Sequence, residues 1–176
     1  MLFYLIRFNN YRCFNSIGPI GLKPSEYFNI ITSPEQPQML LRYEVCSGHR
    51  KAEELCFGVW SVDLANSLRK ANASGFYTHP VEVTKSGQPI DGYLGVRITG
   101  KGGPIDRLRS GAPLTGTPII YHKAIYMDIH RWDGSDVFLL PDMGGNVFVT
   151  ERAAQAIQKT KMRALRLIPN DQCSLP

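Results

Sequence analysis

Residues 132–169 read WDGSDVFLLPDMGGNVFVTERAAQAIQKTKMRALRLIP and contain the clearest local pattern of the chain. Thr150 is well placed to cap a helix, and Glu151 adds negative charge at the positive end of the helix dipole. Apolar runs before Thr150 and after the helix predict strands over residues 137–140, 146–149 and 164–168. The stretch therefore predicts a β-β-α-β unit.

The helix predicted after Thr150 is amphipathic, because its apolar residues recur at helical spacing. The side chains expected to face the core are Ala153, Ala154, Ile157 and Met162. Those expected to face solvent are Arg152, Gln155, Gln158 and Lys159.

The remaining elements are predicted from the same kinds of signal. Clusters of apolar and β-branched residues predict strands over residues 2–8, 39–46, 76–83, 93–98 and 119–129. Pro80 favours a sheet edge for the strand that contains it, and the break at His122 and Lys123 indicates a tight hairpin or a bulge. Ser61 is the predicted N-cap of a helix over residues 62–72, with Gly75 as its stop.

These elements predict an α+β fold: a single domain with a mixed or largely antiparallel sheet and about two helices packed on it. Within one domain over residues 1–176 we distinguish an N-terminal part (1–84), a Gly/Pro-rich loop region (85–118) and the C-terminal β-β-α-β part (119–176). Helices are too few for regular βαβ units. The long loop region is typical of a functional or mobile loop.

Composition points to an ordinary globular protein. Hydrophobic residues make up 43% and charged residues 20% of the chain. The N-terminus has neither the basic region nor the long apolar core of a signal peptide, so we expect a cytoplasmic protein that does not interact with a membrane. The cysteines have no C-x-x-C spacing, which favours free thiols over zinc ligands or disulfides; they are Cys13, Cys46, Cys56 and Cys173.

Candidate chemistry is sparse. His122 and His130 lie near Asp128, Asp133 and Asp136, which could form a metal or acid–base site, but the spacing matches no known ligand motif. Asp133 also suits a turn with the glycine that follows it, and Asp136 suits acceptance of backbone hydrogen bonds. We expect no metal, no cofactor and no catalytic residue. An enzyme that uses these histidines and aspartates is the weaker alternative.

Two further patterns could bind anions. The segment TGKGGP (residues 99–104) lacks P-loop spacing and predicts a flexible glycine turn. The net charge of +5 and a basic cluster near the C-terminus allow a small module that binds nucleic acid, although we do not favour that partner. The cluster comprises Lys159, Lys161, Arg163 and Arg166.

The C-terminal stretch resembles bacterial immunity proteins of polymorphic-toxin systems, including those paired with type VI secretion and contact-dependent toxins. The resemblance rests on WDGSDVF (residues 132–138), VFVTER (residues 147–152), the alanine-rich helix and the closing strand at 165–168. It differs at residues 160–162, where many relatives carry a glycine, and it covers about the last quarter of the chain. It implies that the N-terminal part is variable and tuned to one toxin.

The resemblance further implies a non-catalytic function: stoichiometric binding of a cognate toxin or effector protein. The predicted partner-binding residues are His130, Arg131, Trp132, Asp133 and Asp136. The alternative is that Trp132 lies in the core and only the charged residues face the partner. Because an inhibitor of a nuclease's basic cleft should be acidic and this chain is basic, we expect the covered toxin surface to be neutral or acidic. The sequence leaves self-association open.

Overall fold

A computed structural model describes residues 1–8, 41–45, 54–56, 58–111, 124–143, 145–160, 162 and 165–173, with the backbone alone for 8, 41–45 and 54–56. The strands are β1 (Phe3–Phe8), β2 (Leu41–Val45), β3 (Glu54–Cys56), β4 (Val59–Ser61), β5 (Phe76–His79), β6 (Val81–Lys85), β7 (Gln88–Pro89), β8 (Tyr93–Ile98), β9 (Gly100–Lys101), β10 (Val137–Leu139), β11 (Val147–Thr150) and β12 (Leu165–Pro169). The helices are α2 (Val62–Lys70), α3 (Arg107–Ser110) and α4 (Glu151–Lys159), and the 3-10 turns are η1 (Ile129–Arg131) and η2 (Asn170–Gln172).

The described strands form three sheets. The largest has five strands in the order β12-β1-β11-β10-β9, and all of its pairs are antiparallel except β10 with β9. A four-stranded antiparallel sheet has the order β3-β4-β8-β5, and a three-stranded sheet has the order β2-β6-β7. Two helices of nine residues each, α2 and α4, accompany them. The predicted α+β fold, with mixed and mostly antiparallel sheets, is confirmed.

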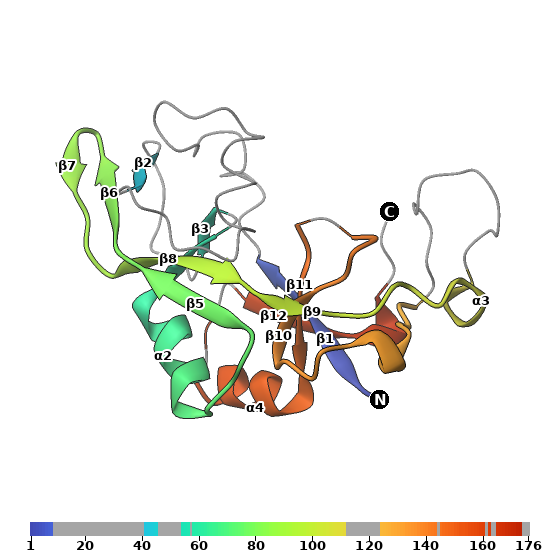
Figure 1. Cartoon of the computed structure of the whole chain (residues 1–176). Helices are drawn as coiled ribbons and strands as arrows, with labels where there is room; N and C mark the ends of the chain where they lie inside the picture. The colour runs from blue at the N-terminus through green and yellow to red at the C-terminus, as the bar shows by residue number, and fades with distance from the viewer. Residues whose placement is uncertain are drawn as a thin grey trace.

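The five-stranded sheet separates two hydrophobic cores, because side chains alternate between the faces of each strand. One face packs against α2 and α4, which lie side by side in Figure 1. The core between this face and the helices includes Val137, Val147 and Val149 from the sheet and Leu64 and Ile157 from the helices. The opposite face carries three phenylalanines whose ring centroids lie 5.7–6.0 Å apart, namely Phe3, Phe138 and Phe148. The β-β-α-β unit thus contributes to both cores.

The two long helices begin where the sequence predicts. The Ser61 hydroxyl accepts a hydrogen bond from the Leu64 N–H at 3.2 Å, and the Thr150 hydroxyl accepts one from the Ala153 N–H at 3.5 Å. In α4 the predicted core residues Ala153, Ala154 and Ile157 are buried, and Met162 packs against the same core. The predicted solvent side is exposed as well: Arg152, Gln155, Gln158 and Lys159.

The first strand is held by the C-terminal part of the chain. β1 pairs with β11 on one side and β12 on the other. The Asn170 side chain accepts a hydrogen bond from the Phe3 N–H at 3.2 Å and donates one to the Ile125 carbonyl at 3.0 Å. Residues far apart in sequence therefore complete the sheet together.

Three predictions need correction. Residues 76–83 form two strands in different sheets, β5 and β6, because Pro80 has no N–H to continue the ladder. The described residues 124–129 of the predicted strand 119–129 contain only an isolated bridge from Met127 to Ile105 and the start of η1. The segment 99–104 is not a flexible turn, because residues 100 and 101 form β9 and pair with β10.

Other predictions fall partly or wholly outside the described residues. Of the region 85–118, residues 85–111 are described, and they contain β7, β8, β9 and α3 rather than loop alone. Cys173 is a buried free thiol, and burial raises its pKa to about 11. The side chains of the other three cysteines and the break at residues 122–123 are not among those described. Within the described residues, no helix has the length and apolar character needed to cross a membrane.

Candidate functional site at residues 129–136

The turn η1 opens the segment that carries the predicted partner-binding residues. Asp128 caps it: its carboxylate accepts a hydrogen bond from the His130 N–H at 3.0 Å, and its own N–H donates to the Pro104 carbonyl at 2.9 Å. The side chains of Ile129, His130 and Arg131 are all exposed. We call Ile129, His130, Arg131 and Asp133 the loop surface.

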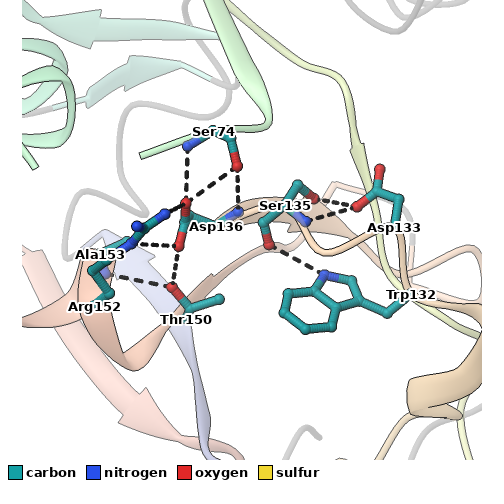
Figure 2. A network of polar contacts seen from close by, with 8 residues as sticks. All are labelled: Ser74, Trp132, Asp133, Ser135, Asp136, Thr150, Arg152 and Ala153. Atoms are coloured by element: carbon teal, nitrogen blue, oxygen red, sulfur yellow. Dashed lines mark hydrogen bonds and ion pairs between the residues drawn. The ribbon is translucent and has the colours of Figure 1, made fainter. Parts of the chain in front are cut away.

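Trp132 points away from this surface. It is half-buried, with its ring centroid 6.0 Å from that of Phe138. Its indole N–H donates a hydrogen bond to the Ser135 carbonyl at 3.1 Å (Figure 2). The indole therefore packs as an anchor beneath the loop, which agrees with the alternative that places Trp132 in the core.

Asp133 fastens the loop to β9 while remaining exposed. One carboxylate oxygen accepts hydrogen bonds from the Ser135 N–H at 3.0 Å and hydroxyl at 2.5 Å, and the other accepts one from the Lys101 N–H at 2.8 Å. The Asp133 N–H donates to the Lys101 carbonyl at 3.1 Å. Burial alone would raise the pKa of Asp133, but the hydrogen bonds from Ser135 and Lys101 lower it below its usual range. Gly134 completes the predicted turn with a positive φ of 83°.

Asp136 fastens the other end of the segment, and only 4% of it is exposed. Its carboxylate accepts hydrogen bonds from the Ser74 N–H at 3.0 Å, the Ser74 hydroxyl at 3.1 Å and the Thr150 hydroxyl at 2.8 Å. The Arg152 guanidinium forms an ion pair with the same carboxylate and donates through Nε at 3.1 Å. Figure 2 shows these three partners converging on Asp136 from different elements.

The pKa of Asp136 reflects two opposing effects. Burial raises it, and the hydrogen bonds from Arg152, Ser74 and Thr150 lower it. The hydrogen bonds prevail, so the pKa lies below its usual range and the group stays ionised in the folded protein at neutral pH. Because the charge is paired, it can stay buried without the full desolvation cost.

The five predicted partner-binding residues thus occupy two different environments. Trp132 and Asp133 both form hydrogen bonds with Ser135, Asp136 is buried among other partners, and His130 and Arg131 are left at the surface. Asp136 cannot touch a partner directly, because its oxygens face Ser74, Thr150 and Arg152. Whether the exposed members bind a partner stays a prediction.

No sequence pattern pointed to Ser74 as a residue of the site. It lies 62 residues before Asp136, yet it accepts a hydrogen bond from the Asp136 N–H at 3.2 Å, and its carbonyl accepts one from the Val137 N–H at 3.0 Å. Local patterns cannot reveal a partner so distant. The nearest residue that a sequence pattern marks is Gly75, the predicted helix stop. Its φ of 91° lies in the region that favours glycine.

The histidine–aspartate alternative stays a prediction. His122 lies outside the described residues, and the nearby carboxylates of Asp128, Asp133 and Asp136 accept hydrogen bonds from protein groups. Among the described residues, no three histidine, cysteine or acidic side chains are grouped to hold a metal ion. In the basic cluster, Lys159 and Arg166 are exposed, and residues 161 and 163 are not described.

Comparison with known proteins adds no family to this description. No protein-family model matches the chain, and no curated protein matches it significantly.

Proposed function

We propose that the chain is a non-catalytic immunity protein that binds a cognate bacterial toxin directly and neutralises it. The observation that carries the proposal is the construction of the segment 129–136. Its exposed side chains at His130 and Arg131 lie beside two inward anchors, the Trp132 indole and the Asp136 carboxylate. A surface that is already ordered loses less conformational entropy on binding, so rigid support of this kind favours stable protein association.

The residues that resemble immunity proteins support the proposal in a second way. The motif residues Phe138, Phe148 and Val149 are buried in the two cores, and Thr150 caps α4. They build a frame whose outward residues are free to differ from one protein to the next. A family of inhibitors that each recognise a different toxin requires a common frame with a variable surface.

Charge favours one class of toxin surface. The chain carries a formal net charge of +5, and the loop surface contributes the exposed cation Arg131, while its one carboxylate, Asp133, already accepts hydrogen bonds from Ser135 and Lys101. Complementarity therefore favours a neutral or acidic surface on the toxin over a basic nucleic-acid cleft. The association rate constant should fall as salt is added, because screening weakens steering between opposite charges.

The direct test is co-expression with the C-terminal domain of the large secreted protein expected to be encoded immediately upstream. Rescued growth together with co-elution of the two proteins from a sizing column would support the proposal. A double variant, His130→Glu with Arg131→Glu, should weaken the complex at least about tenfold if the loop surface is a central contact. Toxicity that persists without a complex would contradict the proposed function.

A further inference from the structure

The one-turn helix α3 is fixed at both ends and along one side. The Asp106 carboxylate accepts a hydrogen bond from the Arg109 N–H at 3.1 Å, and Gly111 ends the turn in a left-handed conformation with φ of 68°. Ser110 is buried, and its hydroxyl accepts a hydrogen bond from the Tyr126 N–H at 2.9 Å. These contacts hold α3 against the segment that leads to η1.

The inward position of Ser110 determines where Leu108 points. Successive residues of a helix are turned by about 100°, so a residue two positions away faces roughly the opposite side. Leu108 accordingly lies on the outside, and 77% of it is exposed. A leucine held in this orientation gains little from the protein's own core, and burial by a partner would remove its apolar surface from water.

Two arginines flank Leu108 on the same turn. Arg107 and Arg109 are both exposed, and the Arg109 guanidinium lies 4.5 Å from the centre of the Tyr126 ring, which restrains it. The nearest carboxylate in sequence, Asp106, is engaged with the backbone as the helix cap. The α3 surface, defined as Arg107, Leu108 and Arg109, is therefore an exposed apolar side chain between two cations.

This surface lies at the same end of the molecule as η1. The bridge between Ile105 and Met127 joins the segments that precede α3 and η1, and the Asp106 N–H donates to the Tyr126 carbonyl at 2.8 Å. Figure 1 places α3 far from the β6–β7 hairpin. A stable interface covers about 800 Å² on each partner, more than one helical turn offers, so a single partner would cover both the α3 surface and η1.

We infer that the α3 surface contacts the toxin and that the toxin there presents carboxylates around an apolar depression. This inference rests on the proposed function and adds the chemistry of the partner. The cations favour an acidic surface, and the exposed Leu108 favours a protein over nucleic acid, whose backbone offers charge without an apolar pocket. Ile129, which is 44% exposed, extends the apolar part of the interface on η1.

The test compares three variants for binding to the purified upstream-encoded toxin domain by surface plasmon resonance. Leu108→Asp should raise the dissociation constant at least about tenfold. Arg107→Glu with Arg109→Glu should slow association and reduce its dependence on salt. The control, Arg69→Glu with Lys70→Glu, makes the same change in net charge at the end of α2 and should change affinity less than about threefold.

The outcomes separate the two proposals. If the wild type binds and protects while both α3 variants bind like the control, the inference about α3 is overturned and the immunity function stands. If the wild type neither binds nor protects, both proposals fail. If the arginine variant loses binding only to a short RNA and retains full toxin affinity, α3 is a nucleic-acid contact and the inference is overturned. Thermal unfolding of each variant should stay within a few degrees of the wild type, since the altered side chains are exposed and lose only weak surface interactions.

Discussion

Asp136 joins parts of the chain that are distant in sequence. Its carboxylate receives hydrogen bonds from Ser74, which follows α2, and from Thr150 and Arg152 at the start of α4. The Asp136 carbonyl also accepts a hydrogen bond from the Thr150 N–H at 2.9 Å. One buried charge therefore sets the position of the loop, the turn after α2 and the N-terminus of α4.

Replacing Asp136 with Asn should destabilise the protein by about 2 kcal/mol, because hydrogen bonds to a charged group are worth about 1.5–3 kcal/mol each and only part of them would be lost. Urea unfolding monitored by circular dichroism would measure the loss. The matched control is Asp91→Asn at an exposed position, which should stay within about 0.5 kcal/mol of the wild type. Equal stabilities for the two variants would contradict the structural role of Asp136.

Stability should fall in acid because the pKa values of Asp133 and Asp136 are lowered on folding. The unfolded chain then binds protons more readily than the folded protein, so protonation favours unfolding. The contribution is complete above the ordinary value of 3.8 and is lost as the pH falls through the folded pKa. The urea concentration at the midpoint of unfolding should therefore decrease for the wild type once the pH is below about 4. The midpoint of the Asp136→Asn variant should decrease less over the same pH range. A parallel decline in both proteins would refute this assignment.

At the scale of elements, β9 depends on close contact between backbones. A Cβ on Gly100 would lie 2.0 Å from the Val137 carbonyl oxygen and 2.2 Å from the Ser135 hydroxyl. The two residues that obstruct this Cβ, Ser135 and Val137, flank Asp136 in the sequence. Gly100 and Gly102, which suggest a flexible turn in the sequence, are instead required for close packing of β9 and the residue after it against β10.

The variant Gly100→Ala should cost about 3 kcal/mol or more, because backbone and a buried side chain would have to move apart. Gly87→Ala is the control: nothing lies within 4 Å of the added Cβ, although its φ of 74° imposes a cost of about 1–2 kcal/mol. Differential scanning calorimetry would show which of the two variants has the lower unfolding temperature. A Gly100 variant more stable than the Gly87 variant would show that β9 is not packed as described.

Local sequence patterns predict many of the helices and strands. They fail where contacts between residues distant in sequence determine the structure. Ser61 and Thr150 mark helix starts because a cap interacts with residues only three positions away. The role of Gly100 was hidden, because it depends on Val137. The short helix α3 was missed because one turn has no periodicity to detect.

In the candidate site as well, local patterns predict some features and miss those that depend on distant residues. The turn at Gly134 and the acceptor role of Asp136 could be predicted from residue type and spacing. The burial of Asp136 could not, because it depends on Ser74, a serine with no distinguishing pattern around it. Partner-binding residues are harder still to predict, since exposure follows from the whole fold.

For the whole molecule, the main sheet depends on its first strand. Leu5 is 2% exposed and sits in β1 between β11 and β12. Leu5→Ala should cost about 2–5 kcal/mol through lost packing and a residual cavity. Leu2→Ala, at a residue that is 38% exposed, should cost less than about 0.5 kcal/mol. Comparable urea midpoints for the two variants would show that β1 is not central to the sheet.

During synthesis on the ribosome, β1 cannot pair until its two neighbouring strands, β11 and β12, have been made. Phe3 is synthesised 167 residues before its hydrogen-bond partner Asn170. At about 5–20 residues per second, synthesis of the intervening chain takes roughly 10–30 s. The apolar segment FYLIRF has neither neighbouring strand during that time, which makes it a natural target for nascent-chain chaperones. The main sheet is thus completed only after β12 has left the ribosome, and β1 stays without its final partners until then.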